Sequence, residues 1–252
     1  MISWRLLTFS WHGAAENMAL DETLLRLAPR PTLRLYGWRP GALSIGYSQE
    51  IPEGWKDPLV RRQTGGGAIW HEREVTYSLT GHEDDLASRN DIRGLYRRAH
   101  AGVIRAMAEF GLECRVQEEG EARGKDDPFA CFEKPAAGDV LAPSGKKIAG
   151  SAQRRLRKRL LVHGSVMLSH DRRNGRGGTG LKEELDREVE PEALADALGR
   201  GFAEAFRVPL EPASLMEEEE ALAERLLAKY ESEAWTRRKG SDEGEGGGAD
   251  DE

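Results

Sequence analysis

The sequence contains two cysteines, and one of them stands where a nucleophile could act. Cys131 lies in the irregular segment FACFEKP, which is flanked by prolines. Loops on a rigid scaffold often hold catalytic residues, and a cysteine thiolate is a strong nucleophile. Cys131 is therefore a candidate nucleophile, although its position alone also fits an incidental loop thiol. Cys114 shares one face of a predicted strand with Leu112 and Val116, a pattern that indicates a small buried hydrophobic residue.

The segment RRQTGGGAIWH, residues 61–71, could bind an anionic or carbonyl-bearing group. Gly65, Gly66 and Gly67 lack a Cβ atom, so their backbone N–H groups can approach a ligand closely. An arginine such as Arg62 beside this turn suits an anionic or carbonyl-bearing partner. The spacing matches neither a Walker loop nor a dinucleotide-binding fingerprint. Taken alone, the segment also fits a plain glycine turn.

Two later segments, GKKIAGSAQ and HGS, place polar groups on predicted strands. If Ile148 points to the core, Lys147 and Ala149 point to the opposite face, which sets an ammonium beside space for a ligand. An exposed lysine pair after a turn is the alternative. His163, inside an apolar strand, could contact a ligand or could be a structural histidine with satisfied hydrogen bonds.

Hydrophobic periodicity predicts the elements that position these groups. Short turns between the early strands favour antiparallel pairing. Alternation of Leu33 and Leu35 with Arg34 predicts that the strand 32–38 is half-buried. The last helix is expected to begin at a capping box formed by Ser214 and Glu217. The predicted helices cover 15–27, 92–110, 191–207 and 214 to about 235; the predicted strands cover 32–38, 43–47, 75–80, 112–116 and 160–168, with a hairpin across 139–153 and loops at 118–130 and 169–187.

This order of elements predicts an α+β fold with a mainly antiparallel or mixed sheet and packed helices. We expect one catalytic domain over residues 1–238. The segment GSDEGEGGGADDE at 240–252 carries six acidic residues and no basic ones. Its low complexity predicts that 239–252 form a disordered, acidic, glycine-rich tail.

The composition of the chain argues against several classes of function. The formal net charge is −7, which argues against bulk attraction to nucleic acid. No apolar run approaches the roughly 18 residues of a membrane span, and the N-terminus does not resemble a signal peptide, so we expect a cytoplasmic protein that does not bind membranes. Two cysteines are too few for a disulfide framework or a cysteine-built metal site, and no metal ligands are predicted.

Taken together and in order, the motifs RRQTGGGAIWH, GKKIAGSAQ and HGS resemble the signature segments of the biotin/lipoate protein ligase superfamily. The segments NMALDETLL and LRLYGWRPGALSIGYSQ resemble the N-terminal region of that superfamily, and the resemblance covers roughly residues 3–238. CFEKP, ahead of Lys147, resembles the cysteine loop of the octanoyltransferase branch, which loads lipoyl domains in many bacteria.

The resemblance implies a ligase-like catalytic fold and transfer of an octanoyl group without a cofactor. The donor would be an acyl carrier protein, and the acceptor would be a lysine in the lipoyl domain of a 2-oxoacid dehydrogenase or in the glycine cleavage H protein. Cys131 would carry the acyl group and Lys147 would tune the thiol. Gly66 or Ser151 would offer oxyanion-binding N–H groups. The implied substrate-binding residues are Arg62, Gly65, Gly66, Gly67, Ala68, Ile69, Trp70, His71, Ser151, Ala152, His163 and Gly164, with Gly65–Gly67 and Trp70 lining the acyl slot.

The sequence departs from the branch in two places. The branch usually has a serine and an aromatic residue after the proline of the cysteine loop, whereas Ala136, Ala137 and Gly138 stand here. This difference leaves the shape of the pocket, and hence the preferred chain length, open. The position after His71 is often aspartate in the superfamily and is Glu72 here.

Other functions remain compatible with the sequence. In an ATP-dependent lipoate or biotin ligase, Lys147, Arg62 and the segment 67–70 would hold an acyl-adenylate with ATP and Mg²⁺, and Cys131 would be incidental. A non-catalytic acyl-binding or lipoyl-domain-binding module would form no covalent adduct. Transfer between two lipoyl domains is a variant of the transferase. The basic run 154–159 could steer acidic carrier proteins and lipoyl domains or could be a solvated hairpin tip.

Overall fold

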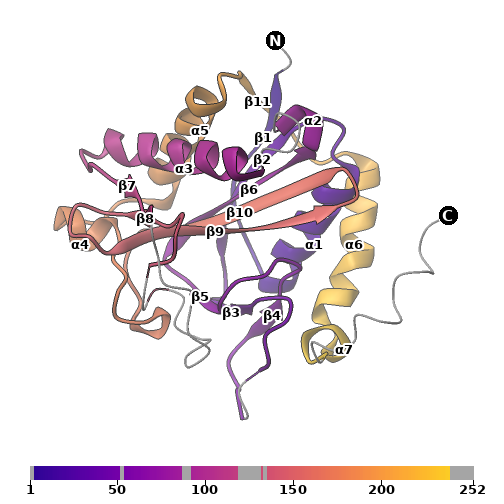
Figure 1. Cartoon of the computed structure of the whole chain (residues 1–252). Coiled ribbons are helices and arrows are strands. Elements are labelled where there is room, and N and C mark those ends of the chain that lie inside the picture. Colours follow the sequence, from indigo (N-terminus) through magenta and orange to yellow (C-terminus); the bar gives the residue numbers. More distant parts are fainter. Residues whose placement is uncertain (1–2, 52–53, 87–91, 119–131, 133–134, 239–252) are drawn as a thin grey trace.

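The computed structural model describes residues 3–51, 54–86, 92–118, 132 and 135–238. Within these residues the chain forms a large sheet, a small sheet, and helices on both faces of the large sheet (Figure 1). This arrangement confirms the predicted α+β class with a mixed sheet. The predicted acidic tail lies outside the described residues, so the domain boundary at residue 238 stays a prediction.

In the described part of the chain, the large sheet has eight strands and is antiparallel except at one edge. β6 pairs antiparallel with β2 and β10, and the ladder continues antiparallel through β9, β8 and β7, whereas β1 runs parallel to β2 and β11. In spatial order the strands are β11 (Leu210–Pro212), β1 (Trp4–His12), β2 (Thr32–Trp38), β6 (Glu74–His82), β10 (Arg159–Met167), β9 (Lys147–Leu156), β8 (Val140–Leu141) and β7 (Arg115–Val116).

The small sheet has the order β4 (Leu59–Arg61), β3 (Ala42–Ile45), β5 (Ile69–His71). β3 runs parallel to β4 and antiparallel to β5. Because β4 and β5 flank the glycine-rich segment, this sheet fixes both ends of the glycine turn.

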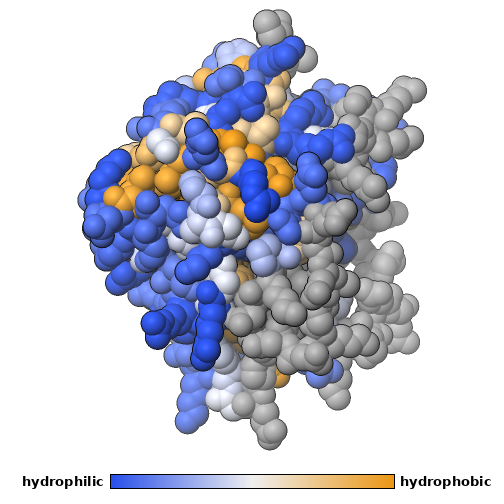
Figure 2. Space-filling view, turned by 60° about the vertical axis from the view of Figure 1, so that its left-hand side comes forward, coloured by the Kyte–Doolittle hydropathy of each residue, from blue (hydrophilic) through white to orange (hydrophobic). Residues whose placement is uncertain are grey.

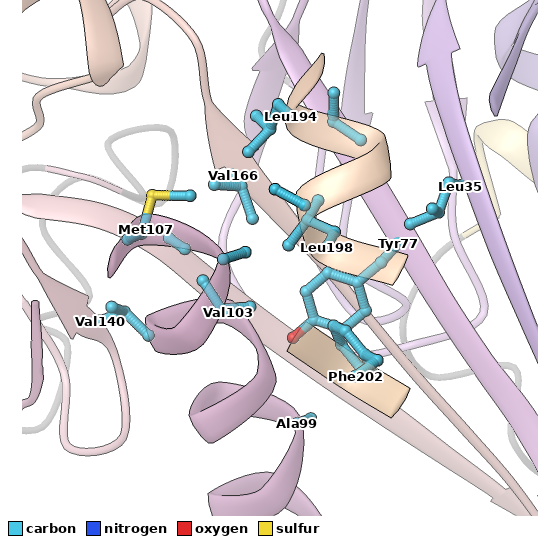
Figure 3. Packing of buried hydrophobic residues seen from close by; sticks show 14 of the residues in the cluster. Leu35, Tyr77, Ala99, Val103, Met107, Val140, Val166, Leu194, Leu198 and Phe202 are labelled. Carbon is cyan, nitrogen blue, oxygen red and sulfur yellow. The ribbon is translucent and has the colours of Figure 1, made fainter. Parts of the chain in front are cut away.

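Two helices, α3 and α5, cover one face of the large sheet and form the main core with it (Figure 3). Val103 of α3 and Phe202 of α5 are fully buried and pack in the same cluster as Tyr77 of β6. Burial of a side chain such as Phe202 contributes about 1.5–3 kcal/mol. The helices are α1 (Ala14–Leu27), α2 (Glu83–Leu86), α3 (Ile92–Glu109), α4 (Leu181–Leu185), α5 (Pro191–Phe206), α6 (Glu217–Glu231) and α7 (Glu233–Thr236), with one 3₁₀ turn, η1 (Arg172–Asn174).

α1 and α6 cover the opposite face of the large sheet. This corrects one prediction about the burial of a strand. Met18 of α1 and Tyr230 of α6 pack in one cluster with Tyr36 and Trp38 of β2. Every residue of β2 is therefore buried, including Arg34, and β6 is buried along almost its whole length. The prediction that the strand 32–38 is half-buried is wrong, because alternation of polar and apolar residues does not reveal a polar side chain that is buried with partners.

The strand β1 was not expected from the pattern of its residues. Arg5 interrupts the apolar run, yet it is buried and pairs with Glu219 at 2.6 Å. The register with β2 also shifts between Leu7 and Ser10, which breaks the two-residue period. A buried ion pair and an irregular register together hide the strand from periodicity.

The last helix begins later than the predicted capping box. α6 starts at Glu217, and the carboxylate of Glu219 accepts a hydrogen bond from the backbone N–H of Met216 at 2.9 Å. Arg5 holds the same carboxylate and also donates to the carbonyl of Ser214 at 2.9 Å. The capping box is therefore formed by Met216 and Glu219 instead of Ser214 and Glu217, and Arg5 holds its glutamate.

Two further expectations are corrected by the structure. The segment 169–187, expected as a loop, contains η1 and α4, and the strand expected over 112–116 is limited to β7. Cys114 is partly buried against the main core instead of standing in a regular strand. Both deviations occur in short elements, whose periodicity is weak.

Seen from the side of β7 and α4, the surface is mainly hydrophilic and carries one hydrophobic band (Figure 2). Partly buried apolar side chains such as Tyr96, Ile104 and Leu185 close the margin of the main core. None of the helices in the described ranges is both long and apolar enough to span a membrane.

Candidate active site

A cavity lies between the large and the small sheet and brings together most of the residues predicted for the site. Its wall includes α1, strands β2, β3, β5, β6, β9 and β10, and the glycine turn. The predicted residues that line it are Arg62, Gly66, Gly67, Ile69, His71, Lys147, Ser151, Ala152, His163 and Gly164. Segments that lie far apart in the chain, from Met18 to Ser165, thus meet at one place.

Three predicted site residues do not line the cavity. On β5, Ile69 and His71 face the cavity, so Trp70 between them faces the other way. Trp70 packs with Ala68 in the core of the small sheet. Gly65 is exposed on the glycine turn. The structure therefore does not place Trp70 or Gly65 where an acyl slot would need them.

Cys131, the predicted nucleophile, lies outside the described residues. The residue bonded to it, Phe132, is fully buried and lines the cavity. The backbone N–H of Phe132 donates to the carbonyl of Asn174 at 2.9 Å. The side chain of Asn174 in turn exchanges two hydrogen bonds with the backbone of Trp70, at 2.6 and 2.8 Å. Asn174 thus ties Phe132 to strand β5.

Lys147 is the buried cation of the cavity. Its side chain is 1% exposed, and its Nζ lies 2.9 Å from Oδ2 of Asp139 and 4.6 Å from the ring centroid of Phe132. A Cβ atom on Gly150 would come within 2.7 Å of that Nζ. The sequence motif therefore needs its glycine to leave room for the ammonium.

A β-bulge directs Lys147 into the cavity. The pairing of β8 with β9 skips Ile148, since Leu141 pairs with Lys147 and Val140 pairs with Ala149. Ile148 and Ala149 both join the main core, while Lys147 lines the cavity. The expectation that Ala149 would share the face of Lys147 is wrong, because the bulge breaks strict alternation.

Arg62 shapes the glycine turn from inside. Its guanidinium donates to the carbonyls of Gly65 and Gly67, at 3.0 and 2.6 Å, and to both the carbonyl and the hydroxyl of Ser44 at 3.0 Å. Gly66 has a φ of 96°, which favours glycine. These contacts hold the turn at the wall of the cavity.

Ser44, His71 and Glu74 form a chain of hydrogen bonds at the cavity wall. The hydroxyl of Ser44 lies 2.7 Å from Nε2 of His71, and Nδ1 of His71 contacts Oε1 of Glu74. The indole of Trp38 stacks on the imidazole with ring centroids 3.8 Å apart. Burial lowers the pKa of His71, and although Glu74 opposes this, the imidazole is neutral at pH 7.

A second chain runs through His163. Its Nε2 lies 2.7 Å from the hydroxyl of Thr64, and its Nδ1 lies 3.0 Å from Oδ2 of Asp21. Asp21 also accepts hydrogen bonds from Arg34 at 3.0 Å and from Tyr36 at 2.9 Å. This buried network joins α1, β2, β10 and the glycine turn.

We expect Asp21→Asn to lower the free energy of unfolding by about 3–5 kcal/mol, because Arg34 is left buried without its carboxylate. For a chain of this size, that loss lowers Tm by roughly 2–4 °C per kcal/mol. Thermal and denaturant unfolding measure it. Glu204→Gln removes the exposed pair with Arg105 and should cost less than about 1 kcal/mol. Equal losses in the two variants would contradict the prediction.

The same network predicts an acid-dependent stability. Burial raises the pKa of Asp21, but His163 and Arg34 outweigh burial, so the pKa of this carboxyl is lower than usual. The stabilisation is fully present above the ordinary pKa of about 3.9 and is lost as pH falls through the lower pKa of the folded protein. The Asp21→Asn variant should therefore approach wild-type stability only below about pH 4.

The hydroxyl of Ser151 makes its contact on the face of the sheet that α3 covers. Its Oγ lies 2.6 Å from Nε2 of His100 on α3. Burial lowers the pKa of His100 to about 4, assisted by Lys147 and opposed by Asp139. The hydroxyl of Ser151 is therefore held by a neutral histidine, and the oxyanion role of its backbone N–H stays a prediction.

The sequence reasoning missed the residues that complete the two hydrogen-bonded chains, above all Ser44, Glu74 and Asp21. A usable signal was present for the acids. Glu74 opens a strand in which apolar residues alternate with uncharged polar ones, and Asp21 lies in a helix beside apolar residues. Carboxylates that are fully buried are nearly always paired, so an acid within an apolar pattern indicates a partner elsewhere in the chain. Ser44 carried no comparable signal.

The second cysteine has the properties of a structural residue. Burial raises the pKa of Cys114 to about 11, and Glu184 adds to the effect. Its thiol is therefore protonated at neutral pH. In the described part of the chain, histidine, cysteine and acidic side chains form no group suited to a metal ion.

Comparisons with known proteins show related proteins along most of the chain. The family model of the lipoyl protein ligase A/B catalytic domain matches residues 13–203. An octanoyltransferase LipM of Kyrpidia tusciae is 36% identical over 95% of this chain and 100% of its own length. An octanoyltransferase LipM of Exiguobacterium sp. is 34% identical over 94% of this chain and 99% of its own length.

A solved structure shares the fold. The crystal structure of lipoate-protein ligase A bound with ATP matches with a TM-score of 0.78 at 25% identity, covering 94% of this chain and 99% of that chain. The two octanoyltransferases are thus more similar in sequence to this chain than the ligase is, over an equal span.

Proposed function

This chain belongs to the lipoyl protein ligase A/B catalytic domain family, and we propose that it is an octanoyltransferase that loads lipoyl domains through a thioester on Cys131. Membership confirms the superfamily expected from the motifs. The similarity to octanoyltransferases along the whole chain is the observation that carries the activity. The buried ammonium of Lys147 against Phe132, the neighbour of Cys131, supports the role of the thiol.

The proposed first step loads the enzyme. The thiolate of Cys131 attacks the carbonyl of the octanoyl thioester on an acyl carrier protein, the new C–S bond forms, and the carrier thiol leaves with a proton. A free thiol has a pKa of about 8.5. In the proposed mechanism, the positive charge of Lys147 lowers the pKa of the Cys131 thiol and raises the thiolate fraction at pH 7. Thioester exchange needs little driving force.

The proposed second step releases the product. The amine of the lipoyl-domain lysine attacks the acyl-enzyme, the C–N bond forms, and the thiolate of Cys131 departs. Because the product is an amide, the step is downhill and needs no ATP. The octanoyl chain would lie against the apolar lining formed by Met18, Trp38 and Ile69. Burying its methylenes stabilises the complex by roughly 5 kcal/mol at about 0.8 kcal/mol each.

The experiment that tests this function leaves out ATP. The protein is incubated with octanoyl-carrier protein and an apo lipoyl domain, and the mass of the intact lipoyl domain is followed with time. We expect octanoylation without ATP. Loading that requires ATP and free octanoate or lipoate would contradict the transferase, and no loading under either condition would favour the non-catalytic module.

The ATP-dependent ligase is the second candidate, because the matching solved structure is a lipoate-protein ligase with ATP. Lys147 and Arg62 would then hold the acyl-adenylate with Mg²⁺. Exchange of pyrophosphate into ATP in the presence of lipoate measures this activity. We expect no exchange above background.

The arginines of the basic run 154–159 differ in what they contact. Arg155 pairs with Glu83 at 2.6 Å, and Arg159 binds the carbonyls of Leu25 and Ala28 at the end of α1. Arg154 instead lies over the ring of Tyr47, 5.0 Å from its centroid. Tyr47 donates its backbone N–H to Thr64 in the glycine turn, so Arg154 stands near the rim of the cavity.

We therefore expect Arg154→Ala to raise KM for the octanoyl-carrier protein roughly threefold to tenfold, since one attractive rim charge contributes about 1 kcal/mol. The effect should shrink as salt rises. Arg155→Ala, on the opposite face of the same strand, is the matched control and should change KM less than twofold. Equal effects of the two substitutions would remove the docking role of Arg154.

A further inference from the structure

Ser44, His71 and Glu74 form a hydrogen-bonded chain that the proposed thioester chemistry does not use. Ser44 and His71 line the cavity, and all three side chains are at least 95% buried. We propose that this chain is a proton relay that deprotonates the lysine of the lipoyl domain before it attacks the acyl-enzyme. The inference rests on the proposed function and deepens its second step.

The hydrogen bonds of the relay have only one consistent direction. A guanidinium can only donate, so the hydroxyl oxygen of Ser44 accepts from Arg62 at 3.0 Å. Its own hydrogen then points to Nε2 of His71, 2.7 Å away. A carboxylate can only accept, so Nδ1 of His71 carries the hydrogen and donates it to Glu74. Nε2 is therefore the basic atom.

Glu74 is held as an acceptor from several sides. The hydroxyls of Thr76 and Ser165 also donate to Oε1, at 2.9 and 2.7 Å. The indole N–H of Trp38 donates to Thr76 at 2.9 Å, which turns the hydroxyl hydrogen of Thr76 toward the carboxylate. Such an arrangement fixes the tautomer and the orientation of a catalytic imidazole.

The surroundings favour a histidine that is neutral at rest and can hold a proton briefly. Burial lowers the pKa of His71, and the nearby charges of Arg62 and His163 lower it further, whereas Glu74 raises it. Once protonated, the imidazolium would be stabilised by Glu74 and by the stacked ring of Trp38, whose plane is only 9° from that of the imidazole.

His163, which is also buried and also lines the cavity, does not offer the same path. His163 contacts Thr64 and Asp21 in the same pattern, but Thr64 does not line the cavity. A proton taken through Thr64 would come from the glycine turn instead of from a ligand. Ser44, by contrast, faces the cavity that Lys147 also lines.

The lysine of the lipoyl domain arrives as an ammonium with a pKa of about 10.4. One of its protons passes to the oxygen of Ser44 while the hydroxyl proton of Ser44 passes to Nε2 of His71. The amine attacks the thioester, the C–N bond forms, the C–S bond breaks, and the second proton goes to the departing thiolate. His71 then releases its proton to solvent.

The test separates the two half-reactions. Wild type and the variants Ser44→Ala, His71→Gln and Glu74→Gln are loaded with octanoyl-carrier protein, freed of carrier, and mixed with an apo lipoyl domain in a single turnover. Hydroxylamine, an amine that needs no deprotonation at neutral pH, is used as a second acceptor. We expect the ratio of lysine transfer to hydroxylamine cleavage to fall by roughly 10²- to 10³-fold in the variants.

The pH profile provides a readout that a purely structural role would not change. Wild-type transfer should reach a plateau near neutral pH, whereas transfer by His71→Gln should keep rising about tenfold per pH unit toward the lysine pKa of about 10.4. Ser10→Ala and His12→Gln are matched controls. They alter a similar surface chain, in which Ser10 contacts His12 at 2.8 Å and His12 contacts Glu16 at 2.7 Å, and should retain the wild-type ratio and profile.

Each outcome has a definite meaning. An unchanged ratio and profile in the relay variants overturns the relay, as does equal loss with both acceptors, which would show a structural defect. An octanoyl ester on Ser44 also overturns it, because Ser44 would then be a nucleophile. If the wild type forms no acyl-enzyme, the proposed function fails before the relay is tested in this assay.

Discussion

Replacement of Cys131 with alanine is expected to reduce octanoyl transfer by about 10⁴-fold or more, because no other group would form the covalent intermediate. The intact mass of the protein after incubation with octanoyl-carrier protein measures the intermediate directly. The wild type should carry one octanoyl group that neutral hydroxylamine removes and that maps to Cys131. The Cys131→Ala variant should carry none.

Cys114 provides the matched control for this prediction. Its thiol is partly buried, and the raised pKa of about 11 leaves very little thiolate at pH 7. Cys114→Ala should therefore retain both the adduct and turnover. Lipoyl-domain loading by Cys131→Ala at the wild-type rate would disprove the thioester mechanism.

Replacement of Lys147 with alanine is expected to have two separate effects. Loss of the buried ammonium should raise the pKa of the reacting thiol and lower the rate of acyl-enzyme formation by roughly 10²-fold. It should also lower the free energy of unfolding by about 3–5 kcal/mol, because Asp139 loses the cation that it contacts in the interior. Stopped-flow loading assays and denaturant unfolding measure these effects independently.

Two further variants separate chemistry from stability. Lys147→Met combined with Asp139→Leu removes both charges and should recover most of the lost stability without recovering the rate. Lys146→Ala removes the exposed neighbour in the same motif and should change neither quantity. Recovery of the rate in the double variant would mean that the ammonium acts only by stabilising the fold.

The motifs that resemble the signature segments of the superfamily predicted where most of the cavity wall comes from. The segments RRQTGGGAIWH, GKKIAGSAQ and HGS each reach the cavity, although each segment taken alone also fitted an ordinary structural role. Trp70 was misplaced because alternation along β5 sets the face of each residue, and the motif does not reveal that face. Ala149 was misplaced because a bulge at Ile148 shifts the alternation.

The polar interior could not be predicted from the same patterns. Arg5, Arg34, Glu74 and Asp21 are buried because each finds a partner on another element, which the local pattern does not show. Periodicity treats these residues as markers of an exposed face. That assumption hid β1 and made β2 look half-exposed, although every residue of β2 is buried.

The anchorage of Phe132 through Asn174 has a mechanical consequence. Strand β5 holds His71 in the cavity wall, and the same strand is clamped by the side chain of Asn174, whose carbonyl retains Phe132 next to Cys131. Phe132 and the strand that bears the imidazole of His71 therefore share Asn174 as a common anchor. Under the proposed mechanism, this anchor would couple the residue that follows the acylated cysteine to the strand that carries the relay histidine.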